Sequence, residues 1–136
     1  ILLHAADAEW IQRPSPNILH WDGSEHRLSP TVCLHRCAGH FPGSTLLHWT
    51  AAPNGRNVIL AGDTLHVTAD RRHLTFMYSV PNYVPAHPDH VERTRAQLAD
   101  LAIDDIYGFT WGLDIIGGGR AALDASIDRY LAAVGR

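Results

Sequence analysis

The sequence lacks long hydrophobic runs, basic clusters and a recognisable leader. No apolar stretch approaches the ~20 residues that a membrane-spanning helix requires, so we expect no membrane partner for these 136 residues. The net charge is −3 and no basic run occurs, which gives no electrostatic basis for binding nucleic acid. The chain starts at an apolar Ile1, without methionine or a signal-peptide pattern, and we expect a fragment or a processed chain.

Cysteine is also scarce. Cys33 and Cys37 are the two cysteines, four residues apart on a predicted strand. That spacing separates them by roughly 13 Å, too far for a disulfide, so we interpret them as small buried residues of a protein in the reducing cytoplasm. With His35 they form a Cys-x-His-x-Cys row of zinc-ligand side chains. Neighbours along one strand face stand about 7 Å apart, so we favour packing over ligation there.

The length and the hydrophobic pattern predict a single α+β domain. The predicted elements are strands at 31–37, 45–49, 57–61 and 103–107, and helices at 2–12, 88–101 and 121–133. A Pro53-Asn54-Gly55 turn joins the second and third strands into a hairpin. This order of elements predicts a mixed sheet with its helices on one face.

One metal-ligand side chain stands at each end of this hairpin. His40 lies in a Gly/Pro turn before the first hairpin strand, and Asp63 follows the second. Antiparallel strands bring such ends together, and an imidazole with a carboxylate suits zinc or a similar divalent ion. The alternatives are that His40 only caps its loop and that Asp63 caps the turn at Thr64. We favour ligation, because an unpaired buried carboxylate is costly.

The same stretch resembles a known family. Its motifs are Gly39-His40-x-Pro42-Gly43-Ser44 and, after a strand, Gly62-Asp63-Thr64. They are similar to the second half of the metallo-β-lactamase fold hydrolases, in which the histidine and the aspartate bind metal. The resemblance implies one half of an αββα sandwich, with residues 1–30 connecting the two halves and residues 31–136 forming the second αβ half.

The resemblance also implies what this chain does not contain. The family's first ligand motif, H-x-H-x-D-H, is absent, so two or three histidines would come from upstream residues. No histidine follows His90, so the family's late ligand is absent too, and Trp111 lies in that loop. We therefore expect one zinc or other divalent ion, held by His40 and Asp63 with the upstream ligands. A metal-bound water would be the nucleophile, and Asp63 would help to orient it.

Aromatic residues provide candidate pocket walls. The segment 65–86 is long and predicted to be irregular, and its Tyr78 and Tyr83 are candidates for contact with substrate. An equally good interpretation is that these rings close the edge of the core. Trp111 either fills the space of the late ligand or shapes the pocket.

We therefore expect a metal-dependent hydrolase of small molecules, represented here by its C-terminal part. The isolated chain is expected to be inactive, because two ligands are fewer than a catalytic zinc site needs. The alternative is a non-catalytic or degenerate half-domain that associates, for example as a homodimer, through the sheet face that its lost half would cover.

Overall fold

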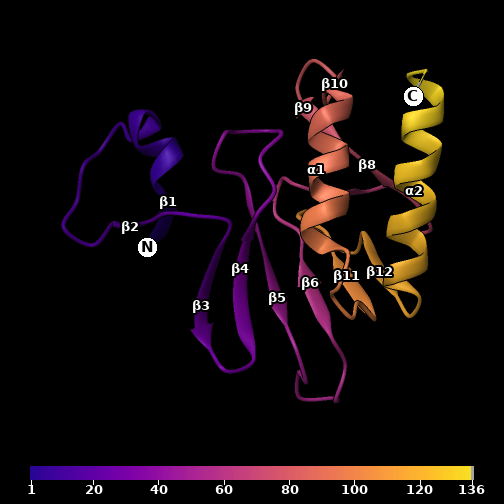
Figure 1. Cartoon of the computed structure of the whole chain (residues 1–136), viewed down its shortest axis with the longest axis horizontal. Coiled ribbons are helices and arrows are strands. Elements are labelled where there is room, and N and C mark those ends of the chain that lie inside the picture. Colours follow the sequence, from indigo (N-terminus) through magenta and orange to yellow (C-terminus); the bar gives the residue numbers. More distant parts are fainter. Residues whose placement is uncertain (136) are drawn as a thin grey trace.

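A six-stranded mixed sheet with both helices on one face dominates the computed structural model, which describes residues 1–135 (Figure 1). The strand order is β12-β11-β6-β5-β4-β3, with β6 and β11 parallel and the other neighbours antiparallel. These strands are β3 (Glu25–Ser29), β4 (Val32–Arg36), β5 (Thr45–Trp49), β6 (Val58–Leu60), β11 (Asp105–Tyr107) and β12 (Asp114–Ile116). The predicted α+β class and mixed sheet are confirmed.

Side-chain alternation sorts the sheet into two faces. On β4, Cys33 and His35 are buried, and Leu34 between them points to the opposite face. Cross-strand pairing continues this separation, because Leu34 pairs with Leu47 and Leu47 with Leu60. The buried face meets the helices and forms the core, whose members are Cys37, Leu46, Ile59, Ala61, Leu65, Val67, Leu74, Phe76, Ala86, Val91, Leu98, Ile103, Ile106, Ile115, Leu123, Ile127 and Leu131.

Two helices cover the buried face. Helix α1 (Pro88–Leu98) begins as predicted, with His87 Nδ1 accepting a hydrogen bond from the Asp89 N–H and Pro88 in the first turn. Helix α2 (Gly119–Ala133) follows a glycine N-cap with φ +81°. The two helices lie side by side in Figure 1, and an Arg95–Asp128 ion pair joins them.

Residues 2–12 do not form the predicted helix. Strand β1 (Leu2–His4) pairs in parallel with β2 (Leu19–Trp21), and between them lies the 3₁₀ helix η1 (Ala5–Trp10). Pairing with β2 takes three residues from the predicted helix 2–12, and six of the remaining eight form a short helix with tighter turns. Because β3 is the edge strand, the main sheet already begins at Glu25.

The segment from 65 to 86 is less irregular than its composition predicts. Its pairs are β7 (His66–Val67) with β8 (Leu74–Thr75), and β9 (Met77–Ser79) with β10 (Val84–Pro85). A hydrogen bond from the Leu74 N–H to the buried Ser126 Oγ ties β8 to α2. The segment is thus anchored to α2 at Leu74, and again at Ala86, whose oxygen accepts a hydrogen bond from the Tyr130 hydroxyl.

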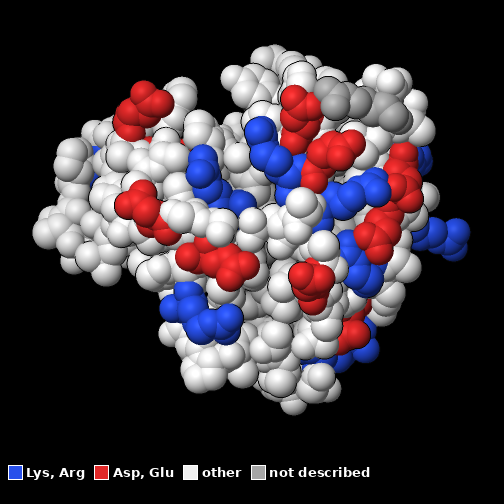
Figure 2. All heavy atoms as spheres, viewed as in Figure 1, with Lys and Arg blue, Asp and Glu red and all other residues white. Residues whose placement is uncertain are grey.

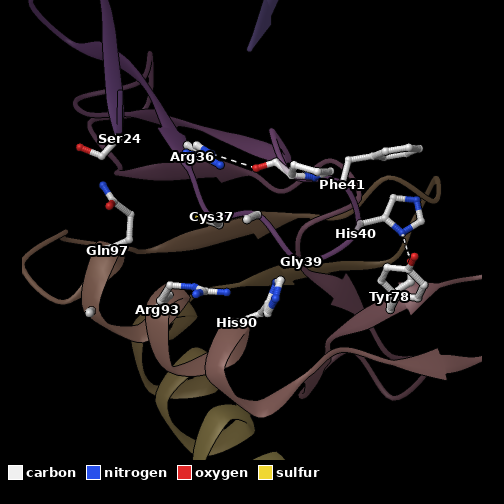
Figure 3. A pocket seen from close by; sticks show the side chains of 13 residues that line it. Ser24, Arg36, Cys37, Gly39, His40, Phe41, Tyr78, His90, Arg93 and Gln97 are labelled. Carbon is white, nitrogen blue, oxygen red and sulfur yellow. Dashed lines mark hydrogen bonds between the residues drawn. The ribbon is translucent and has the colours of Figure 1, made fainter. Parts of the chain in front are cut away.

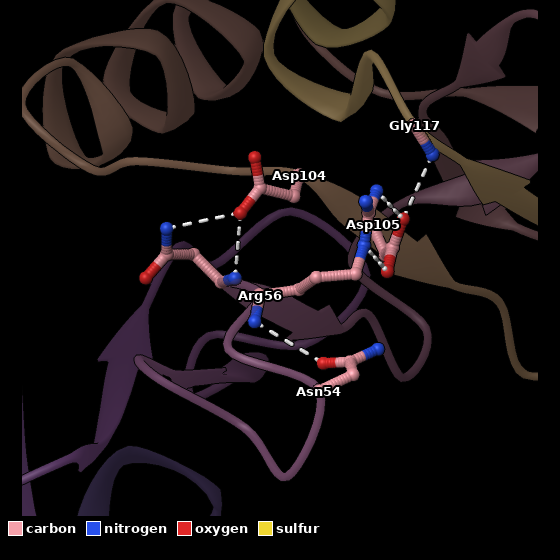
Figure 4. A network of polar contacts seen from close by, with 6 residues as sticks. Asn54, Arg56, Asp104, Asp105 and Gly117 are labelled. Atoms are coloured by element: carbon pink, nitrogen blue, oxygen red, sulfur yellow. Dashed lines mark hydrogen bonds and ion pairs between the residues drawn. The ribbon is translucent and has the colours of Figure 1, made fainter.

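A buried carboxylate fastens the β5–β6 hairpin to β11 (Figure 4). Asp105 is 1% exposed and accepts two hydrogen bonds from the Arg56 guanidinium, both 2.5 Å long, and one from the Gly117 N–H at 2.8 Å. The neighbouring Asp104 accepts from the backbone and side-chain nitrogens of Asn57. The lowered pKa of Asp105 follows mainly from its hydrogen bonds with Arg56.

The sheet face opposite the helices is apolar and open in the described chain. Leu60 is 43% exposed, and Tyr107 and Ile116 on the neighbouring strands are also exposed. In residues 1–135, neither helix has the length and apolarity needed to cross a membrane. Figure 2 shows acidic and basic side chains interspersed over the viewed face, without a patch of one sign.

Candidate metal centre

The turn after β4 presents His40. Ala38 and Gly39 both have positive φ, +57° and +108°, so the chain bends sharply before the histidine. His40 Nδ1 lies 2.8 Å from the backbone oxygen of Tyr78 in β9 (Figure 3). A carbonyl oxygen can only accept, so Nδ1 carries the proton and the lone pair of the neutral ring is on Nε2. Metal-binding histidines are commonly oriented by such a bond.

The N-terminal segment supports the turn that carries His40. The Asp7 carboxylate accepts a 2.7 Å hydrogen bond from the Gly43 N–H, and both groups are buried. A Cβ at Gly43 would lie 2.6 Å from Asp7 Oδ2 and 2.9 Å from the Cβ of His4, so only glycine allows this approach. His4 is fixed in turn through Nε2 to the Gly23 oxygen, 3.0 Å away. Residues 1–23 thereby hold the His40 turn.

Asp63 lies in the turn directly after β6 and is exposed. It lines a cavity of about 390 Å³ with members of the His40 turn and of the N-terminal segment, among them Phe41, Gly43 and Asp7. Its carboxylate is therefore open to a ligand on the side of the N-terminal segment.

His66 was not predicted as part of this region. It is 6% exposed, and its Nε2 has no hydrogen-bond partner. Its ring packs edge-on against Phe109 at 5.0 Å, in the loop where the family resemblance places the late histidine ligand. The pKa of His66 is lowered, first by burial and partly by His40, and Asp63 acts in the opposite direction. The only sequence signal was its position three residues after Asp63.

These three side chains do not converge on one point. Among residues 1–135, the group of three or more ligand side chains with atoms within 4.8 Å of one another is Glu25, Cys33 and His35, at a different place. The chemistry of His40 and Asp63 nevertheless fits a zinc-type ion, because one nitrogen of His40 is already fixed and Asp63 is accessible. The described residues thus offer part of a donor set.

A cavity of about 730 Å³ opens beside His40 (Figure 3). The turn after β4, β9 and α1 form its walls, and Arg36 and Arg93 give it positive charge. Arg36 is oriented by a 2.9 Å hydrogen bond from Nε to the Pro42 oxygen. His90 also lines the cavity, and burial is the main cause of its lowered pKa. We call this space the His40 pocket.

The three aromatic candidates lie differently. Tyr78 lines the His40 pocket and is largely exposed, while its backbone oxygen holds His40. Tyr83 is exposed in the turn between β9 and β10, with φ +53°. Trp111 is fully exposed on the loop after β11. Contact of these rings with a substrate stays a prediction.

Comparison of the sequence with known proteins finds an uncharacterized relative and no matching family model. No family model matches the chain. It is 38% identical over 107 residues to the uncharacterized protein YmaE of Bacillus subtilis (strain 168), a match that covers 79% of this chain and 39% of that protein. The chain thus spans well under half the length of this curated relative.

The crystal structure of the metallo-β-lactamase MIM-1 from Novosphingobium pentaromativorans is similar in fold. Its TM-score is 0.50 at 18% sequence identity, over 97% of this chain and 58% of that chain. At 18% identity, the structural similarity shows the fold and leaves the activity open. The described chain therefore has an α+β fold similar to part of a metallo-β-lactamase.

Proposed function

We propose that this chain forms part of a metal-dependent hydrolase of the metallo-β-lactamase type and provides one side of its metal centre. His40, through Nε2, and Asp63, through its carboxylate, are the ligands from this chain. The hydrogen bond from His40 Nδ1 to the Tyr78 oxygen carries the proposal, since it fixes the tautomer that a metal ligand needs. The remaining ligands come from residues preceding Ile1 in a longer protein.

The chain's own residues have separable roles in this proposal. The contact between Asp7 and Gly43 holds the His40 turn in place. Arg36 and Arg93 in the His40 pocket favour a substrate with a negatively charged group. When bound, a divalent ion acts as a Lewis acid and makes water a better nucleophile near neutral pH.

Nitrogen-15 NMR of the histidine rings tests the ligand assignment. We expect His40 to show a protonated Nδ1 without metal, and its Nε2 resonance to shift when Zn²⁺ is added at millimolar concentration. Asp63→Asn weakens the Zn²⁺ dependence of that shift, whereas His20→Gln, at an exposed position of β2, leaves it unchanged. A protonated Nε2, or a His40 ring indifferent to Zn²⁺, contradicts the proposal.

Catalysis is tested by comparing chains of two lengths. With two ligands the isolated 136-residue chain has fewer than the usual three of a catalytic zinc site, so we expect no hydrolysis of esters, thioesters, lactones or phosphodiesters. A longer protein containing the upstream residues is expected to hydrolyse one of these classes, and Asp63→Asn is expected to abolish that activity. Activity in the isolated chain contradicts the shared centre.

The open sheet face favours a second candidate, an association module. Leu60 and Tyr107 border a cavity of about 370 Å³ on that face, and the rest of the MIM-1 chain, 42% of its length, has no counterpart here. We propose that a second copy covers this face when the chain is isolated. Light scattering would then find a dimer, which Leu60→Glu disrupts and Leu19→Glu, on β2, does not. A monomer excludes this candidate.

A further inference from the structure

A second group of metal-ligand side chains lies on the helix-covered face of the sheet, away from the His40 turn. Glu25 on β3 pairs across the strands with His35 on β4, and Cys33 is two residues before His35 on the same face. One ligand atom from each of the three lies within 4.8 Å of the other two. Spacing along β4 alone would leave Cys33 and His35 too far apart to share an ion, but pairing with β3 adds Glu25 and brings one ligand atom of each residue close together.

His35 is the buried member of this cluster whose ring nitrogens lack partners. It is 3% exposed, and neither of its ring nitrogens makes a hydrogen bond. Glu25 Oε1 lies 3.4 Å from His35 Nδ1, and the two groups form an ion pair only when the ring is protonated. Burial is the main cause of the lowered pKa of His35. Burying two unpaired ring nitrogens is unfavourable, and a bound cation would compensate one of them.

The surroundings orient the other two side chains. The Gln97 amide on α1 donates to Glu25 Oε1 at 3.3 Å, and the Cys33 thiol contacts the Leu34 oxygen at 3.5 Å. Arg27, the nearby cation, reaches the Pro30 oxygen through Nη1. A cavity of about 290 Å³ adjoins all three candidate ligands, so an ion has room and a path from solvent.

His48 on β5 lies next to this cluster. It pairs with Cys33 across β4 and β5, and its ring centroid is 5.9 Å from that of His35. Its Nε2 lies 2.9 Å from the Ala102 oxygen, which leaves Nδ1 as the ring's unprotonated nitrogen. The cluster thus has a second imidazole beside it, on the adjacent strand.

We propose that Glu25, Cys33 and His35 bind a borderline divalent cation of the Zn²⁺ class, at a site separate from His40 and Asp63. Mixed sulfur, nitrogen and oxygen donors select such an ion over Mg²⁺ or Ca²⁺. On binding, the Cys33 thiol releases its proton to solvent and bonds as the thiolate. The ion links β3 to β4 and is independent of the proposed hydrolase function.

Cobalt spectroscopy separates this site from the His40 centre, because only this one contains sulfur. We expect one Co²⁺ per 136-residue chain to produce a thiolate-to-cobalt charge-transfer band in the near ultraviolet, which excess Zn²⁺ removes. Cys33→Ser abolishes the band, and Cys37→Ser, at the other buried cysteine, keeps it. His40→Ala also keeps it. Co²⁺ binding without the band, no binding at all, or a band that survives Cys33→Ser overturns the proposal.

A fold-preserving variant guards against misfolding of the cysteine mutants. Half of the Glu25 side chain is exposed, so Glu25→Gln is expected to fold normally, as judged by circular dichroism. It should weaken Co²⁺ affinity about 10-fold or more, because it replaces the anionic carboxylate ligand by a neutral amide. Glu92→Gln, at an exposed position of α1, is the matched control and leaves the affinity unchanged. Equal affinities for the two glutamine variants contradict the assignment of Glu25.

Discussion

Replacing Gly43 by alanine tests how the N-terminal segment holds the His40 turn. The new Cβ would lie 2.6 Å from Asp7 Oδ2, 2.7 Å from its Cγ and 2.9 Å from the Cβ of His4, all closer than real contacts allow. The carboxylate must move, and the 2.7 Å bond from the Gly43 N–H is lost with it. Overpacking costs about 1–3 kcal/mol and an unpaired buried N–H about 1–3 kcal/mol more.

The total loss for Gly43→Ala is therefore expected to be about 2–6 kcal/mol in the free energy of unfolding. Asp7→Ala removes the same hydrogen bond without the clash, at about 1–3 kcal/mol. In the Asp7→Ala background the alanine at 43 meets mainly His4, so the double variant is expected to be more stable than additivity predicts, by about 1–3 kcal/mol. Urea denaturation of the four proteins measures this coupling.

The control replaces a carboxylate elsewhere. Asp100 is exposed just after α1, so Asp100→Ala and Gly43→Ala are expected to add. Coupling within about 0.5 kcal/mol of zero between positions 7 and 43 would refute the argument that Asp7 and Gly43 approach as described. In the proposed function the same variants also weaken Zn²⁺ binding, because the His40 turn loses its support.

Two further predictions concern the core. The pKa of Asp105 is held low mainly by its hydrogen bonds with Arg56, so its stabilising contribution is complete above the unfolded pKa of about 3.9 and disappears as pH falls through the lower folded pKa. In urea denaturation Asp105→Asn should thus be less stable than wild type at pH 7, with a smaller difference near pH 3; a difference independent of pH would contradict this. Ser126→Ala should lose about 1–3 kcal/mol, because the buried Leu74 N–H loses its acceptor, with the exposed Ser15→Ala as control; equal stabilities would contradict it.

Local signals predicted the parts of the fold that local physics determines. The turn at Pro53-Asn54-Gly55 and the apolar runs beside it predicted the β5–β6 hairpin, which the structure confirms. The predicted start of the helix at Pro88 is confirmed, and the structure identifies His87 as its N-cap. Strand β12 was missed, because three residues next to a glycine run carry too little pattern without their partner β11.

The predicted site was based on the order of motifs along the chain, and the structure adds contacts between residues that are far apart in the sequence. His40 and Asp63 follow strands that the sequence predicted, but the bond from His40 to Tyr78 joins residues 38 positions apart. His66 was overlooked because a lone histidine in an apolar stretch predicts burial, which it has, and says nothing of an unpaired Nε2. Such partners become visible only when distant segments are brought together.

The cluster of Glu25, Cys33 and His35 shows why strand register decides what a sequence can hold. Along β4 alone, Cys33 and His35 stand about 7 Å apart, which argued against ligation. The β3–β4 pairing is irregular: Ser29 pairs with Val32, but Arg27 already pairs with Cys33, so Leu28 is an extra residue. In a regular hairpin Glu25 would oppose Arg36 on the other face, since a shift of one residue exchanges the two faces. The bulge at Leu28 is what sets Glu25 opposite His35. Deleting Leu28 removes the extra residue and leaves Glu25 opposite His35, so that variant is expected to keep the cobalt–thiolate site. Deleting Arg27 as well would set Glu25 opposite Leu34 on the other face, and this second deletion is expected to abolish the site.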